Sequence, residues 1–130
     1  MPRELHDPFA ERKRLQKKRD ELKQRLIQLT QSERSWLDEH APALEAGDAS
    51  TRDEFARREE VKYGANVELG HTEWLLGNTP GALTNLKAAY DYGSADQRAL
   101  VVDVLRDIQT KTGLQLLRAT DLKPGDNVAE

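Results

Sequence analysis

The sequence predicts an all-α protein of about four helices, of which the first is long. Between Pro8 and Pro42 there is no glycine or proline, and the segment is rich in the helix formers Glu, Lys, Arg, Gln and Leu. Further along the chain, apolar residues recur at steps of three and four, as on one face of a helix. The chain shows neither sustained two-residue alternation nor an Asn-Gly hairpin signal, so no β-sheet is expected.

Turn and capping residues divide the chain into predicted helices near 8–40, 51–76, 80–92 and 95–112. The first helix should begin at Asp7, a good N-cap with proline directly after it, and should end at Pro42. The others should begin at capping residues: Thr51, Thr79 and Ser94. Gly93 should cap the C-terminus of the third helix.

The first predicted helix is too long for a compact domain of this size. Some 32 residues of helix span about 48 Å, at about 1.5 Å per residue. A 130-residue globule is only about 36 Å across. We therefore expect three regions: a helical arm over 1–41, a helical bundle over 50–118 and a disordered tail over 119–130.

The second predicted helix has apolar residues on two sides, so it should be the central helix of the bundle. Their stripes are Tyr63, Val67, Gly70 and Trp74, and Val61, Ala65, Leu69 and Leu76. A helix that is apolar on two sides packs between two neighbours.

The second and third predicted helices carry small and large residues at fixed steps, with a glycine at the turn between them. The residues are Leu69, Gly70, Gly77, Ala82, Leu86 and Ala89. In this pattern residues 63–94 resemble a tetratricopeptide repeat (TPR), a helix–turn–helix unit. The chain departs from it at Asn66, Glu73 and Ser94, where the family has tryptophan, tyrosine and proline.

The resemblance covers about a quarter of the chain and occurs once. A TPR binding groove needs about three stacked repeats, so this chain cannot form one alone. The resemblance implies a TPR-like helical hairpin bundle and a role in protein–protein interaction.

A line of large apolar residues runs along the first helix at seven-residue spacing: Leu15, Leu22, Leu29 and Trp36. If these residues occupy the d positions of a heptad repeat, the a positions are Arg12, Arg19, Leu26 and Glu33. Only Leu26 among them is apolar. A long parallel dimer is therefore not favoured. The line could pack against the second helix of the same chain as an antiparallel hairpin, or against another chain.

The candidate partner-binding residues are accordingly Leu15, Leu22, Leu26, Leu29 and Trp36. We expect Leu29 and Trp36 to lie nearest the bundle and to pack on the second helix. Leu15 and Leu22 should then lie beyond the bundle, where another chain could contact them.

Residues 12–25 hold eight basic and two acidic side chains, for a local charge of +6. Candidate phosphate-binding residues there are Arg12, Lys13, Arg14, Lys17, Lys18 and Arg19. Charged runs usually form solvated or acid-paired helix faces. No positioned polar or aromatic reader of bases lies in this segment, so any nucleic-acid binding should be weak and non-specific.

The composition narrows the function classes. The chain has no cysteine and a net charge of −3, and it carries no apolar run of about 20 residues and no apolar leader. Nothing in it forms a constellation for acid–base or nucleophilic catalysis. The Glu68/His71 step of di-iron bundles occurs once instead of twice.

We therefore expect a non-catalytic, cytoplasmic interaction or adaptor protein without cofactor or metal. Its partner should be another protein or a second copy of itself, and it should not bind membranes. The alternative function is nucleic-acid binding through the basic helix over 12–25.

Overall fold

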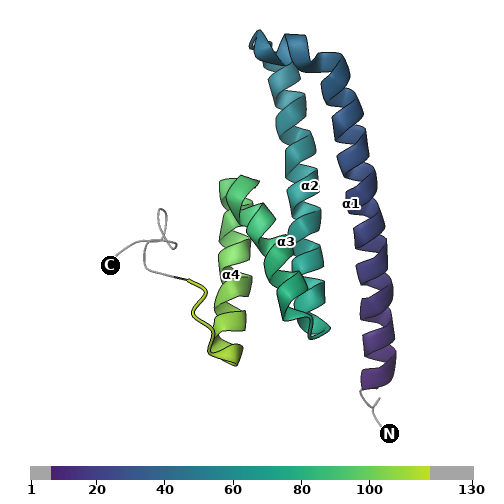
Figure 1. Ribbon diagram of the computed structural model, residues 1–130, viewed down its shortest axis with the longest axis vertical. Coiled ribbons are helices and arrows are strands. Elements are labelled where there is room, and N and C mark those ends of the chain that lie inside the picture. Colours follow the sequence, from purple (N-terminus) through teal and green to yellow (C-terminus); the bar gives the residue numbers. More distant parts are fainter. Residues whose placement is uncertain (1–6, 118–130) are drawn as a thin grey trace, which may run out of the picture.

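The computed structural model describes residues 7–117, and within them the chain forms four α-helices and no strand. The helices are α1 (Pro8–Glu45), α2 (Ala49–Leu75), α3 (Thr79–Tyr92) and α4 (Ala95–Thr112), drawn in Figure 1. The all-α prediction with a long first helix is confirmed. The predicted tail over 119–130 lies outside the described residues.

Helix α1 continues through Pro42 to Glu45, so the prediction that it ends at this proline is wrong. Pro42 removes one helical hydrogen bond, from its own position to the carbonyl four residues back, but its fixed φ is helical and the residues after it keep their amide donors. Its carbonyl still accepts from the amide of Ala46 at 3.0 Å.

Two other helix starts differ from the prediction by a few residues. The N-cap of α2 is Asp48, whose carboxylate accepts from the amide of Thr51 at 2.9 Å and from its hydroxyl at 2.6 Å. These two hydrogen bonds lower the pKa of Asp48 below its usual value. The N-cap of α3 is Asn78, and α4 begins as predicted, with a capping box between Ser94 and Gln97.

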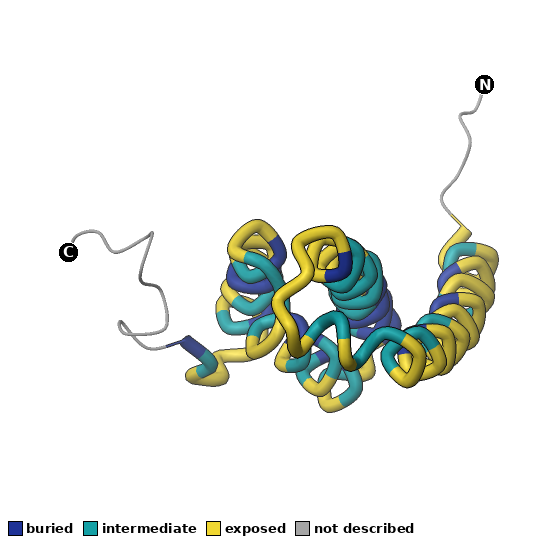
Figure 2. The backbone as a smooth tube through the Cα atoms, turned by 90° about the horizontal axis from the view of Figure 1, so that it is seen from above, coloured by how far each residue is buried: buried dark blue, intermediate teal, exposed yellow. Residues whose placement is uncertain are grey.

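Helices α1 and α2 form a long antiparallel hairpin, and α3 and α4 pack against the second half of α2 (Figure 1). Helix α2 is therefore the central helix, as its two apolar stripes predicted. The end of the hairpin that carries the α1–α2 turn projects beyond α3 and α4. Seen from above, the buried residues lie where the helices face one another (Figure 2).

The core of the bundle is small, and its fully buried members are Ala82, Leu86, Ala89, Val101 and Ile108. At the contact between α2 and α3, a Cβ added to Gly70 would lie 2.7 Å from Cγ of Leu86 and 3.2 Å from the carbonyl oxygen of Ala82. Only glycine therefore permits this approach, as expected from the spacing of small residues along both helices.

Two glycines of α2 should respond in opposite ways to alanine. Gly70→Ala forces a methyl group into Leu86, so we expect the free energy of unfolding to fall by about 1–3 kcal/mol. Gly64→Ala adds a methyl 3.6 Å from the Gln97 side chain, an ordinary contact, and should gain up to about 1 kcal/mol from helix propensity. Urea unfolding of both variants measures the difference. Equal stability of the two would contradict the close packing at Gly70.

Candidate interaction groove

The heptad line of α1 packs against α2 of the same chain, which corrects one expectation. Leu15 and Leu22 are only 8% and 7% exposed, so they do not lie beyond the folded body. The turn at residues 46–48 sends α2 back along α1, so the first half of α1 lies beside the end of α2 that carries α3. Leu15 is therefore covered while the hairpin is closed, and Leu22 presents only a small part of its side chain to a partner.

Of the three polar a positions of α1, Arg12 and Glu33 have partners on α2 or at its C-cap, whereas Arg19 pairs with Asp20 of α1 itself. The guanidinium of Arg12 donates to the carbonyl oxygen of Leu76 at 3.3 Å, at the end of α2. Halfway along α2, Glu33 accepts from Lys62 at 2.5 Å. The charges that disfavour a parallel dimer thus match an antiparallel neighbour in the same chain, and they set the register of the hairpin.

Glu33, Lys62 and Glu59 form a half-buried charged cluster in this seam. The Lys62 ammonium lies 2.5 Å from Glu33 and 3.1 Å from Glu59. Burial alone would raise the pKa of Glu33, but hydrogen bonds with Glu59 and Lys62 hold it below its usual value. Burial and the neighbouring Glu33 raise the pKa of Glu59. The two carboxylates raise the pKa of Lys62 despite its burial, so one ammonium serves two acids.

The projecting end of the hairpin contains an aromatic stack around Trp36. Its indole lies 4.6 Å from the His40 ring and 6.3 Å from the Phe55 ring, measured between ring centroids. The guanidinium of Arg58 lies 5.2 Å from the indole centroid. Trp36 does pack on the second helix, as predicted, but against Phe55 near the start of α2, not near the bundle.

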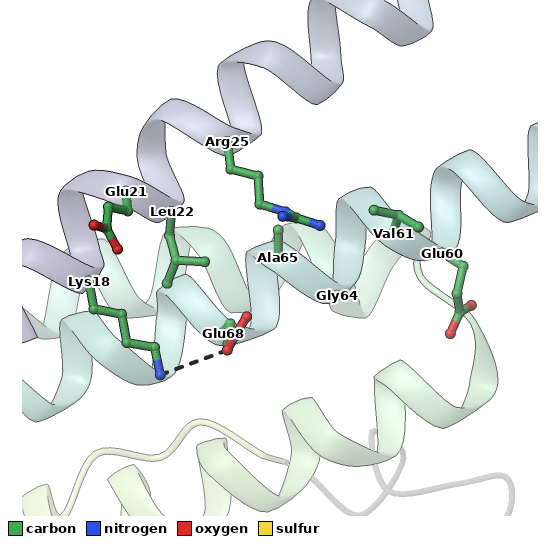
Figure 3. Close-up of a pocket in the computed structure, with 9 residues that line it drawn as sticks. All are labelled: Lys18, Glu21, Leu22, Arg25, Glu60, Val61, Gly64, Ala65 and Glu68. Carbon is green, nitrogen blue, oxygen red and sulfur yellow. Dashed lines mark ion pairs between the residues drawn. The ribbon is translucent and has the colours of Figure 1, made fainter.

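A groove of about 650 Å³ runs between α1 and α2 (Figure 3). Leu22, Val61, Gly64 and Ala65 supply its apolar and small residues. The charged side chains around them are Lys18, Glu21 and Arg25 on α1, and Glu60 and Glu68 on α2. Lys18 approaches Glu68 to 3.8 Å, and Arg25 extends from α1 toward α2.

The groove thus has a predominantly basic wall and an acidic wall. Both Lys18 and Glu68 stay about half exposed, so water screens their attraction and a docking group could replace it. Small residues between two oppositely charged walls suit the binding of a partner helix that has small residues on one face and charged residues along both sides of that face.

The structure divides the basic segment into paired and exposed side chains. Lys18 and Lys23 face glutamates of α2, with Lys23 lying 3.7 Å from the buried Glu73. Arg14 and Arg19 pair with acidic residues of α1 itself. Lys13 and Lys17 are exposed on the surface of α1. The acid-paired interpretation of the segment therefore holds for about half of its cations.

Of the candidate partner-binding residues, Leu26, Leu29 and Trp36 are half-buried along the seam, and Leu22 lies in the groove. The α2 wall of the groove was absent from the predicted site residues. Its signal in the sequence is the adjacent small pair Gly64 and Ala65 between two glutamates. This pair can be recognised as part of a groove only when α1 is known to lie beside α2.

Comparison with known proteins identifies no relative: no protein-family model, no curated protein and no solved structure matches the chain. The TPR resemblance over 63–94 therefore stays a prediction. Within residues 7–117, no helix combines the length and apolar character that a membrane span requires.

Replacing the buried leucines of the seam should open the hairpin. In Leu15→Asp with Leu22→Asp, two carboxylates are forced against α2, and each lost leucine contact alone is worth about 1.5–3 kcal/mol. We expect a large loss of helicity and a lowered melting temperature by circular dichroism. The matched control is Lys13→Asp with Lys17→Asp on the exposed surface, which should melt close to wild type. A folded Leu15/Leu22 variant would contradict the intramolecular seam.

Removing the shared ammonium should destabilise the hairpin in a pH-dependent way. Lys62→Met leaves two half-buried carboxylates without their cation, at a cost of about 2–4 kcal/mol. Their pKa values should then be raised in the folded state, so the variant should regain stability between about pH 7 and about pH 5. Chemical denaturation at both pH values tests this.

The control for that experiment is Lys87→Met, which breaks an exposed pair with Asp91 at 2.8 Å. Such a pair contributes about 0–1 kcal/mol, so this variant should follow the wild-type pH profile. If the two lysine variants lose the same stability, the buried cluster does not stabilise the hairpin.

Proposed function

We propose that this protein is a non-catalytic interaction protein, an adaptor or assembly component, that binds a helix of a partner protein in the α1–α2 groove. The observation that carries the proposal is the groove itself, which lies between α1 and α2. A groove formed within one helical hairpin needs no stacked repeats.

The residues of the groove suit a helix better than a small molecule. Gly64 has no side chain and Ala65 has only a methyl group, so a partner backbone can approach α2 closely, as in ridge-into-groove packing. The apolar surface available is small, since Leu22 and Ala65 are already buried by the hairpin. Affinity would therefore depend on the flanking charges as well as on packing.

The arrangement of the other helices supports a stable groove. Helices α3 and α4 pack against α2, with Gly70 against Leu86 and the Trp74 indole donating to Asp107 at 3.1 Å. Because α2 is held by three helices, one wall of the groove stays fixed during binding, which limits the entropy lost on association.

Exchanging charges between the two walls should abolish partner binding without changing the net charge. In Arg25→Glu with Glu68→Arg, each wall presents the wrong sign to a partner that fits the native groove. The control, Lys17→Glu with Glu39→Arg, makes the same exchange at exposed positions of α1 outside the groove. The measurement is quantitative capture of cross-linked partners by the full chain, together with molar mass from light scattering.

We expect the groove variant to lose its captured protein, or its self-association, while the control keeps it. Circular dichroism should show both variants folded. If the groove variant captures the same proteins in the same amounts as the control, the groove is not the binding surface.

Nucleic-acid binding is the second candidate, and the exposure of Lys13 and Lys17 favours it. The pairing of Lys18 and Lys23 with glutamates reduces the charge available to phosphate. We therefore predict weak binding that falls steeply with added salt and does not distinguish a duplex from its scrambled control. Fluorescence polarisation with labelled duplexes tests this. Tight, sequence-dependent binding would make this the first candidate.

A further inference from the structure

A second, smaller cavity lies between α2 and the α3–α4 turn, separate from the α1–α2 seam. Its volume is about 220 Å³, which is the size of one extended side chain. It is lined by Ala56, Glu59, Glu60, Tyr63, Tyr92, Gly93, Ser94 and Gln97. None of these eight lining residues is basic.

The local backbone holds this cavity in shape. The side-chain amide of Gln97 donates to the carbonyl oxygen of Glu60 at 2.5 Å, which ties the start of α4 to α2. The same side chain accepts from the amide of Ser94 at 3.1 Å as part of the capping box. A Cβ at Gly93 would collide with the carbonyl of Ala89 and with Gln97, so this turn admits glycine only.

Two tyrosine rings form the aromatic part of the cavity. The rings of Tyr63 and Tyr92 lie 6.1 Å apart between centroids, at an angle of 29°. Tyr63 is half-buried, whereas Tyr92 is 69% exposed although it packs against another ring. The Tyr63 ring already attracts a cation, since the ammonium of Lys62 lies 4.8 Å from its centroid.

The charges beside the cavity are incompletely neutralised. Glu59 lines the cavity and shares the single ammonium of Lys62 with Glu33. Glu60, also in the lining, adds a further carboxylate. Two carboxylates and two aromatic faces, in a lining that contains no basic residue, favour an additional cation.

We infer that this cavity binds the guanidinium group of an arginine side chain presented by a partner protein. A planar guanidinium can stack on Tyr92 while it donates hydrogen bonds to the carboxylates of the cavity, which an ammonium cannot do as well. The inference does not depend on the α1–α2 groove, because the two sites have different linings except for Glu60.

The test uses the full chain, labelled with ¹⁵N, and a pair of matched ligands. N-acetyl-arginine amide carries the guanidinium, and N-acetyl-citrulline amide has nearly the same shape without the charge. We expect saturable chemical-shift changes in the arginine titration, confined to amides of residues 56–63 and 92–97. Citrulline should bind at least about tenfold more weakly, since the charged form makes the charge-assisted hydrogen bonds and the cation–π contact.

Two substitutions at Tyr92 separate the role of the ring from that of the fold. Tyr92→Phe keeps the aromatic face and should retain binding, whereas Tyr92→Ala should weaken it by about fivefold, as expected for an exposed cation–π contact. Leu100→Ala, at an exposed position outside the cavity lining, is the control and should bind as wild type does.

Three outcomes would overturn the inference: no saturable shifts in the cavity with arginine, equal binding of citrulline, or unchanged binding by Tyr92→Ala. Equal binding of N-acetyl-lysine amide and the arginine probe would overturn the preference for guanidinium. A failure of the groove exchange described above would leave this result unaffected, because this titration needs no partner protein.

Discussion

The fold depends on the antiparallel pairing of α1 with α2. A helix of 38 residues is far longer than α3 or α4, so it buries its heptad line along α2, which has 27 residues and is the next longest helix. Charged contacts at one end and near the middle of the seam make one register favourable. Arg12 reaches the end of α2, and Glu33 reaches Lys62. These contacts place the walls of the groove opposite each other.

The contact at Gly70 determines how α3 and α4 pack against α2. Because Leu86 packs directly over this glycine, α3 lies close to α2 and its chain can turn at Gly93 toward the start of α4. Gln97 then reaches the backbone of α2 at Glu60. The tyrosine cavity is therefore a product of helix packing far from its own residues, and both candidate sites share α2 as a wall.

Local features of the sequence predicted most of the fold. Capping residues located the start of α4, and small residues at fixed steps located the contact between α2 and α3. Pro42 misled because a proline removes only one helical hydrogen bond, and here the helix continues for three further residues. The prediction that Leu15 and Leu22 lie beyond the bundle was wrong because the length of a helix does not determine the direction of the next helix. The partners of the basic residues, such as Glu68 and Glu73, lie about fifty residues away in sequence, and only the tertiary pairing reveals them.

The projecting end of the hairpin gives the molecule uneven resistance to local opening. Around Trp36, each helix has only the other for support, whereas near Leu15 the seam adjoins the part of α2 that also carries α3. Amide hydrogens should therefore exchange faster toward the α1–α2 turn than toward the bundle. An opening confined to the tip would break contacts between α1 and α2 alone and would leave the core of α2, α3 and α4 intact.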